Sequence, residues 1–340
     1  MQNFQEICVG VTTYNGEKTL EKTLVSLEEQ TFKNFSVLIS DDGSTDNTIN
    51  IIKSFVKRNK NFFYKVNEKN LGMIVNNNKV FIESNSKYFT WVDQDDYREK
   101  DFLKECYHAI EKNPQASLAY AHTGVKNKKD NLLMHINTIK SLSNQKKQTQ
   151  RYKNLLNNFH DTIVYSLIRS SALKKTLLWT NINGSANRLI FQLALEGEFV
   201  EVSKLLSFYN GRGLKNRYNS DIEYLRQSKS KRKFYQIPFL VLFFSQAKDI
   251  IMKKFNIYLK IKILIILLNN FIKINSLKFF YRIFEKIFFK KLNDYIYKII
   301  LKFNPENQDI VQIVEKRFYP DFYPKHYPYK KMSGIVNGDN

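Results

Sequence analysis

Apolar and polar positions follow two alternating patterns over the first 125 residues. Short apolar runs rich in β-branched and aromatic residues predict buried strands at 6–14, 34–40, 62–67, 87–92 and 116–122. Segments with apolar residues at helical spacing lie between these runs, at 17–30, 45–59, 73–84 and 101–113. Strands separated by helices of this length predict an α/β fold with a doubly wound, mostly parallel sheet.

The pattern changes further along the chain. Residues 126–160 are polar and weakly periodic, which predicts a loop over the ligand site. A helix at 186–199 and a short strand at 200–209 restore order. From about Tyr235 the chain turns to long Ile/Leu/Phe/Lys segments typical of helices.

These patterns predict the domain organisation. We expect one domain at 1–213 (halves 1–125 and 126–213), a linker at 214–234, a basic amphipathic helical region at 235–318 and an extended or disordered tail at 319–340. The tail has three Tyr-Pro steps and little to bury. We also expect a chain truncated at about Lys233 to keep nucleotide binding.

The formal charge of +22 is concentrated near the C-terminus, where residues 248–302 hold 13 Lys/Arg against 3 Asp/Glu. Such an excess suggests an anionic partner. Two cysteines, Cys8 and Cys106, offer neither a disulfide framework nor a metal-ligand spacing, and both are expected reduced in a core. The N-terminus lacks a basic region followed by a long apolar one, so no signal peptide is expected.

Apolar residues of the C-terminal third fall on one helical stripe. They are Phe280, Phe284, Ile287, Phe288, Leu292, Tyr295, Ile296, Ile299 and Ile300. No run reaches the roughly 20 apolar residues that cross a bilayer. Three alternatives stay open for these helices: binding an anionic membrane surface, packing on the first domain, or forming a homodimer.

Carboxylates crowd the ends of two predicted strands. The second strand ends in "SDDGSTDNT" (40–48), and the fourth runs from "YFTWV" directly into Asp93, Asp95 and Asp96. Gly43 suits the positive φ of a tight turn. The two turns are expected on neighbouring strand ends, where parallel sheets bind ligands. Hard oxygen ligands at this spacing suit Mg²⁺ or Mn²⁺ shared with a diphosphate.

Several other classes lack their motifs. No G-x-x-x-x-G-K-[ST] segment occurs, which excludes a P-loop NTPase by motif, and no G-x-G-x-x-G follows the first strand. Nucleic-acid binding through the basic C-terminal part lacks any recognised module, so no nucleic acid is expected as a partner.

The stretch "VGVTTYNGEKTLEKTLVSLEEQTFKNFSVLISDDGSTDNT", followed by "NLGMIVNNN" and "YFTWVDQDD", resembles the donor half of family 2 glycosyltransferases, which have the GT-A fold. The resemblance covers roughly 7–112, with a weaker match to about 213, and the combination of motifs is highly specific. The "DQDD" form of the DxD motif is similar to that of the rhamnosyltransferase-like branch, which builds surface polysaccharides.

The resemblance implies roles for individual residues. Thr12 and Tyr14 would lie against the nucleotide base, and Asp42 would accept a hydrogen bond from the base imide with Asp41 beside it. Asp93 would face the ribose or a metal-bound water, and Asp95 would ligate the metal. Further donor-binding positions match Asn70, Gly72 and Asn78, while Asp96 would brace the loop.

The implied reaction is displacement at the anomeric carbon with inversion, in which a carboxylate base deprotonates the acceptor hydroxyl. The chain departs from the family where that base is expected, because Ser185, Ala186 and Asn187 occupy the position. Asp161 is another candidate base. A second departure is Asn77, where many members carry an arginine near the donor phosphates; Arg188, Arg212 or a lysine is a candidate to replace that charge.

The resemblance thus implies a metal-dependent glycosyltransferase that uses a UDP- or dTDP-sugar donor. Its acceptor would be a cell-surface glycan, such as lipopolysaccharide, O-antigen or capsule, or a lipid-linked glycan. We expect it in the cytoplasm or at the inner face of the cell membrane. The alternative is a catalytically weak or inactive GT-A protein that binds nucleotide sugar as a partner in a glycan assembly complex.

Overall fold

The computed structural model describes most of the first 210 residues and two later helices. The described residues are 4–126, 132–136, 143, 145–157, 161–182, 184–210 and 238–288. The predicted linker at 214–234 and tail at 319–340 lie outside these ranges.

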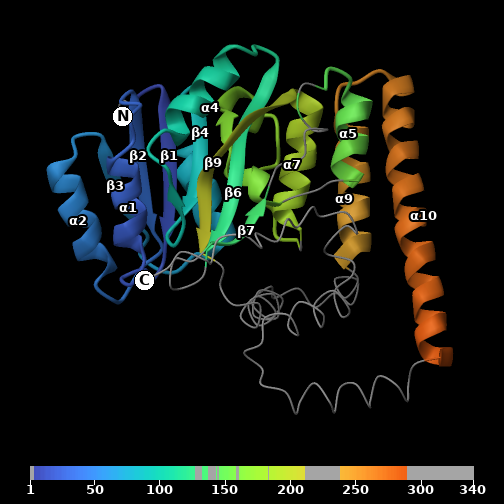
Figure 1. Cartoon of the computed structure of the whole chain (residues 1–340), viewed down its shortest axis with the longest axis horizontal. Helices are drawn as coiled ribbons and strands as arrows, with labels where there is room; N and C mark the ends of the chain where they lie inside the picture. Colours follow the sequence, from blue (N-terminus) through green and yellow to red (C-terminus); the bar gives the residue numbers. More distant parts are fainter. Residues whose placement is uncertain are drawn as a thin grey trace, which may run out of the picture.

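The apolar runs near the N-terminus form the parallel part of a sheet (Figure 1). β1 (Ile7–Thr13) lies between β2 (Phe35–Asp41) and β4 (Tyr88–Asp93), and β3 (Phe62–Val66) pairs with β2. All four strands run in the same direction, so their carboxyl ends meet at one edge. The acidic turns after β2 and β4 therefore flank β1 rather than sitting on adjacent strands, which corrects one expectation.

The other strands extend this sheet beyond β4. They are β8 (Leu167–Arg169), β6 (Ala116–Lys126), β9 (Glu198–Asn210) and β5 (Tyr97–Arg98), with β7 (Leu132–Ile136) paired to β6. β8 is antiparallel to both β4 and β6, so β6 and β9 run with the first four strands. Among the described strands six of nine share one direction, which confirms the mostly parallel sheet.

Helices cover both faces of the sheet (Figure 1). One face carries α1 (Leu20–Glu28), α2 (Thr48–Arg58) and α4 (Phe102–Glu111). The other carries α3 (Met73–Ile82), α5 (Gln148–Asn157), the short α6 (Ser170–Leu173) and α7 (Ser185–Glu196). Side chains along each strand alternate between two apolar cores, as a sheet covered on both faces requires.

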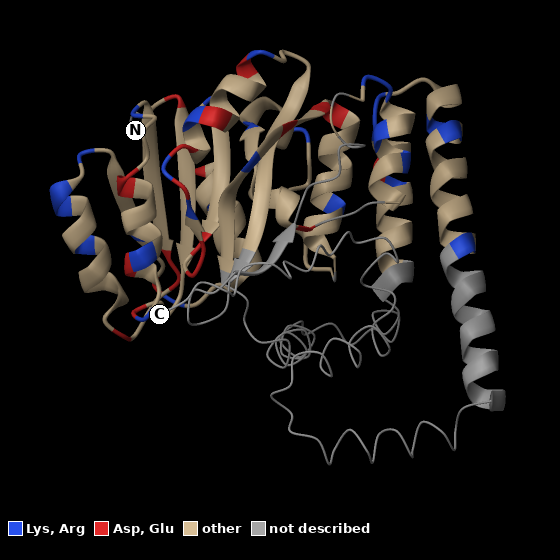
Figure 2. Ribbon diagram, viewed as in Figure 1, with Lys and Arg blue, Asp and Glu red and all other residues tan. Residues whose placement is uncertain are grey.

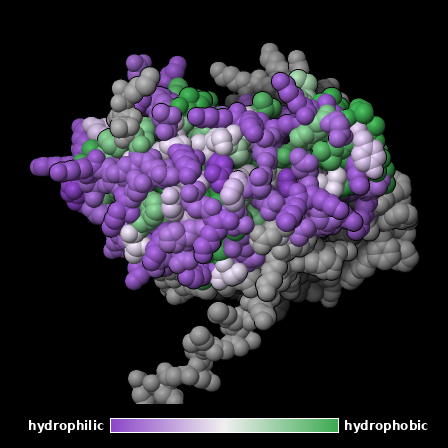
Figure 3. Space-filling model, turned by 90° about the horizontal axis from the view of Figure 1, so that it is seen from above, coloured by the Kyte–Doolittle hydropathy of each residue, from purple (hydrophilic) through white to green (hydrophobic). Residues whose placement is uncertain are grey.

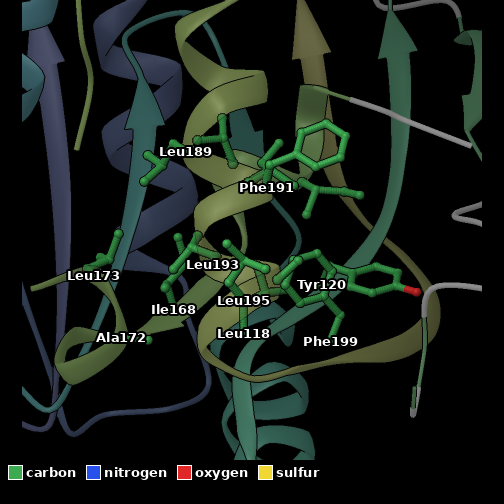
Figure 4. Close-up of a cluster of buried hydrophobic side chains, with 14 of the residues drawn as sticks. Leu118, Tyr120, Ile168, Ala172, Leu173, Leu189, Phe191, Leu193, Leu195 and Phe199 are labelled. Carbon is green, nitrogen blue, oxygen red and sulfur yellow. The ribbon is translucent and has the colours of Figure 1, made fainter. Parts of the chain in front are cut away.

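One of the two cores, called the second core below, lies on the face covered by α3, α5, α6 and α7, and it extends from β1 and β4 to β6, β8 and β9. Figure 4 shows part of it, including Leu118 and Ile168 from the sheet and Leu189 and Leu193 from α7. Packing is tight enough at Gly10 of β1 that an added Cβ would lie 2.5 Å from Cζ of Phe89. Both cysteines are buried and unpaired with each other, as expected.

The C-terminal helices pack on this second core. α9 (Pro238–Met252) contacts α7, and α10 (Ile257–Phe288) contacts α5 and α9. Ile250, Ile263 and Leu267 are buried there, so packing on the first domain holds for the part whose side chains are described. Side chains of the predicted stripe at 280–300 lie outside that part. No helix among the described residues is long and apolar enough to cross a bilayer.

Two expectations about the chain after residue 125 are wrong. The stretch 126–160 contains β7 and α5 rather than only loop. The apolar pattern did not reveal α5, because its buried face includes the charged residue Arg151. The Arg151 guanidinium donates hydrogen bonds to the carbonyls of Ala194 and Lys146, so it can be buried. The predicted short strand at 200–209 is 13 residues long.

Candidate active site

The turn after β2 is built around two buried carboxylates. Asp41 accepts from the backbone N–H of Ser44 at 3.0 Å, and Gly43 between them has φ +77°, as predicted. Asp42 is only 2% exposed and accepts from the backbone N–H groups of Leu71 and Gly72, both at 2.9 Å. The carboxylate of Asp42 therefore ties this turn to the segment that leads into α3.

The turn after β4 carries the other three acids. Asp93 is half-buried, and its Oδ2 accepts from the hydroxyl of Tyr165 at 2.7 Å. Asp96 is buried, and its N–H donates to the carbonyl of Asp93 at 3.1 Å, which closes the turn. Asp95, half-buried, lies between them at the tip. Figure 2 shows acidic segments on the loops at this edge of the sheet.

A pair of tyrosines connects these acids to Asp161. Tyr165 ends the 3-10 helix that begins at Asp161, and its ring lies 5.5 Å from that of Tyr209 on β9. Burial, and next the charge of Asp93, raise the pKa of Tyr165 well above its usual value. Burial and the charges of Asp96, Asp93 and Asp161 raise the pKa of Tyr209 in the same way. Three carboxylates from two segments, the β4 turn and the start of the 3-10 helix, thus act on this pair of tyrosines.

The end of β1 is held to α3 and to the β4 turn. The Thr12 hydroxyl donates to the side-chain oxygen of Asn77 on α3 at 2.8 Å. Oε1 of Gln94 accepts from the Thr13 hydroxyl at 2.6 Å and from the N–H of Tyr14 at 2.8 Å. The Tyr14 side chain is 43% exposed, which leaves its ring accessible for stacking. Sequence reasoning missed Gln94, which stands between the acids of the DQDD segment.

The start of α3 contains the other predicted donor residues. Asn70 accepts from the N–H of Gly72 at 2.9 Å, and Gly72 has φ +88° with open space where a Cβ would stand. Asn78 points elsewhere: its amide exchanges two hydrogen bonds with the backbone of Trp179, at 2.8 and 2.9 Å. Asn78 thus joins α3 to the segment before α7, and the structure does not bring it together with the acids.

The first turn of α7 lacks a carboxylate, as the sequence indicated. Gly184, with φ +79°, precedes the helix, and Ser185 accepts from the N–H of Thr180 at 2.7 Å. Asn187 is half-buried near Gly184. Arg188 is not a free cation for a phosphate, because its guanidinium forms a bidentate ion pair with Asp249 of α9. Arg212 lies outside the described residues.

The carboxylates of the β4 turn can supply only part of a metal site. Within the described ranges, no three His, Cys, Asp or Glu side chains are grouped so that they could hold an ion. Asp93 and Asp95 are hard oxygen ligands on one turn, which suits Mg²⁺ or Mn²⁺ because these ions keep waters and take further ligands from a diphosphate. The donor set therefore fits such an ion as a pair of ligands.

Comparison with solved structures identifies the fold. S. aureus TarS 1–349 in complex with UDP-GlcNAc superposes with a TM-score of 0.57 at 20% identity, over 92% of this chain and 82% of that one. A second crystal structure of S. aureus TarS 1–349 gives a TM-score of 0.58. The sheet order, the helical layers and the C-terminal helices are those of a GT-A protein.

Sequence comparison gives the family. The profile described as "Glycosyl transferase family 2" matches residues 8–177, which is half of the chain. The chain belongs to this family. "Glycosyltransferase GlyA" of Streptococcus pneumoniae is 34% identical over 105 residues, which are 31% of this chain and 15% of that protein. "Putative teichuronic acid biosynthesis glycosyltransferase TuaG" of Bacillus subtilis is 29% identical over 36% of this chain and 48% of its own length. The chain thus matches less than half of each relative.

Proposed function

We propose that the protein is an inverting glycosyltransferase that moves a sugar from a UDP- or dTDP-sugar to a cell-surface glycan. The observation that carries the proposal is that the two acidic turns, around Asp42 and Asp93, lie at the same edge of the sheet on either side of β1. Ligands bind at this edge in open α/β sheets. The family match and the UDP-GlcNAc bound by TarS support a nucleotide sugar as the donor.

The base and the ribose would be held by the turns that flank β1. Tyr14, with its exposed ring, would stack on the base, and Asp42 would accept the imide N–H at Oδ2, to which the structure gives one donor, Gly72. Thr12, Asp41, Asn70 and Gly72 shape this end of the site. Asn78 would not contact the donor. It would support the site by holding α3 to the backbone of Trp179.

The diphosphate would lie near the DQDD turn. Asp93 and Asp95 would hold Mg²⁺ or Mn²⁺, which when bound would neutralise charge on the leaving diphosphate. The Tyr165 hydroxyl orients Asp93 through its 2.7 Å hydrogen bond. Asp161 would take the proton of the acceptor hydroxyl, because the amide of Asn187 cannot. The charge of Asp161 acts on Tyr209 together with the charges of Asp93 and Asp96, so Asp161 lies on the same side of the site.

The acceptor class is a finer part of the proposal. The DQDD segment supports the rhamnosyltransferase-like branch, and TuaG supports a surface polysaccharide such as O-antigen, lipopolysaccharide or capsule. A lipid-linked glycan acceptor would place the protein at the inner face of the cell membrane. An anionic membrane surface would suit the basic C-terminal region.

A second candidate function is a nucleotide-sugar-binding partner without catalysis. The absence of a carboxylate at 185–187 favours it. Both candidates bind the donor, but only the first releases nucleoside diphosphate from it.

Asp42 provides the test of the donor proposal. We expect wild-type protein to bind uridine or thymidine diphosphate more tightly than guanosine or adenosine diphosphate in calorimetry. Asp42→Ala should reduce that preference by about 1–3 kcal/mol, the cost of leaving a buried polar group unpaired. Preference of the wild type for guanosine diphosphate would contradict this orientation of the donor. Because Asp42 also holds Leu71 and Gly72, circular dichroism must confirm that the variant is folded.

A further inference from the structure

The face of α10 that points away from the core carries a regular apolar stripe. This outer stripe consists of Tyr258, Ile261, Ile265, Leu268 and Ile272. The spacing alternates between three and four residues, so all five lie along one side of the helix. Each is between 46% and 71% exposed, whereas Ile263 and Leu267 on the opposite side are buried. Figure 3 shows hydrophobic residues gathered at the end of the molecule formed by α9 and α10.

The charges beside the outer stripe have one sign. Residues 250–284 contain seven Lys/Arg and no Asp or Glu. Lys262 and Lys273 are exposed on α10, and Nζ of Lys262 lies 5.8 Å from the ring centroid of Tyr258 in the stripe. An apolar strip with lysines alongside it is the pattern of a helix that lies in the interface of an anionic bilayer.

We propose that the outer stripe of α10 docks on an anionic phospholipid surface. A second copy of α10 would bring mainly basic residues against basic residues, because residues 257–284 of α10 hold no acid and Glu285 lies beyond the outer stripe. Residues 289–340 hold nine Lys/Arg against six Asp/Glu, so the remaining chain is not the charge complement either. The inference deepens the proposed function and rests on it in one respect. Membrane contact would bring the enzyme to a lipid-linked acceptor.

The position of α10 suits this role. Figure 1 shows α10 beside α9 at one end of the molecule, with its C-terminal end extending past the edge of the sheet that carries the acidic turns. The buried Arg188–Asp249 ion pair fixes α9 to α7, and the ring of Phe271 on α10 lies 4.4 Å from that of Phe243 on α9. A surface bound by α10 is thus connected through α9 to α7.

The test uses full-length protein and co-sedimentation with vesicles. We expect binding to vesicles of phosphatidylglycerol and phosphatidylcholine, and little binding to phosphatidylcholine alone. Ile265→Asn/Leu268→Asn should weaken the partition coefficient about tenfold or more, because two apolar side chains leave the bilayer. Lys262→Gln/Lys273→Gln should weaken it about fivefold per lysine, and added salt should reproduce that loss. Ile82→Asn on α3, whose side chain is 69% exposed, is the matched control and should bind like wild type.

Three results would overturn the proposal. The first is wild-type protein that ignores anionic vesicles, and the second is a stripe variant that binds them as well as Ile82→Asn. The third is a wild-type dimer that Ile265→Asn/Leu268→Asn converts to monomer without vesicle binding, which would assign the stripe to a second copy. UDP binding, measured for each variant, is independent of vesicles, so failure of membrane docking is distinguishable from failure of the donor proposal.

Discussion

Asp249→Ala should lower the free energy of unfolding by about 3–5 kcal/mol, although Asp249 lies in the C-terminal region that the sequence treats as separate. Its carboxylate accepts from Arg188 at 2.6 and 2.7 Å and from Gln192 at 2.6 Å, and the Arg188 and Asp249 side chains are only 10% and 8% exposed. Removing Asp249 would leave the Arg188 charge buried without its partner. Urea denaturation measures the loss.

The control is Glu28→Ala, which removes the partner of Arg58 in a pair whose side chains are 30% and 45% exposed. Solvent screens that pair, so we expect its loss to cost less than about 1 kcal/mol. Equal effects of the two substitutions would show that α9 does not stabilise the first domain. The same ion pair argues against the expected independence of a chain truncated at Lys233, which would lose α9 and leave Arg188 unpaired.

Asp161→Asn should lower the turnover of donor hydrolysis by about 10²–10⁴-fold and leave the affinity for UDP unchanged. The amide keeps the size of the side chain but cannot accept a proton. Hydrolysis is the appropriate assay because water replaces the unidentified acceptor and also needs a base. Release of UDP from a panel of UDP-sugars measures it.

Asn187→Ala is the matched substitution at the position where the family usually carries its base. It should change turnover much less than Asp161→Asn, because an amide contributes no proton acceptor there. An undiminished rate in Asp161→Asn would remove Asp161 from the mechanism. Absence of hydrolysis in the wild type, together with intact UDP binding, would favour the non-catalytic alternative.

Local patterns predicted the donor half well. The runs that became β1, β2 and β4 are apolar enough to be buried on both faces, whereas the edge strand β3 is exposed towards its end. The positive φ of Gly43 followed from its place in a tight turn. These features depend on neighbouring residues, so the sequence was sufficient to predict them.

Features that depend on distant partners could not be predicted. β5 and β8 have two and three residues, too few to show a period, and pairing with β9, β4 and β6 creates them. Asn78 matches a donor-site position by sequence but bonds Trp179, 101 residues away. The sequence suggested Arg188 as a cation for the donor phosphates, but its guanidinium is paired with Asp249 of α9, 61 residues away.

The central claim is that the two acidic turns bind a nucleoside diphosphate together with a divalent ion. Calorimetry of UDP with and without Mn²⁺, on wild type and on Asp95→Asn, tests it most directly. We expect Mn²⁺ to strengthen UDP binding in the wild type and to have no effect in Asp95→Asn, which keeps the shape of the turn but loses a ligand charge. Asp101→Asn, which removes an acid that bonds Thr31 at the start of α4, should behave as wild type. UDP binding that Mn²⁺ strengthens equally in wild type and Asp95→Asn would contradict the assignment of the metal to this turn.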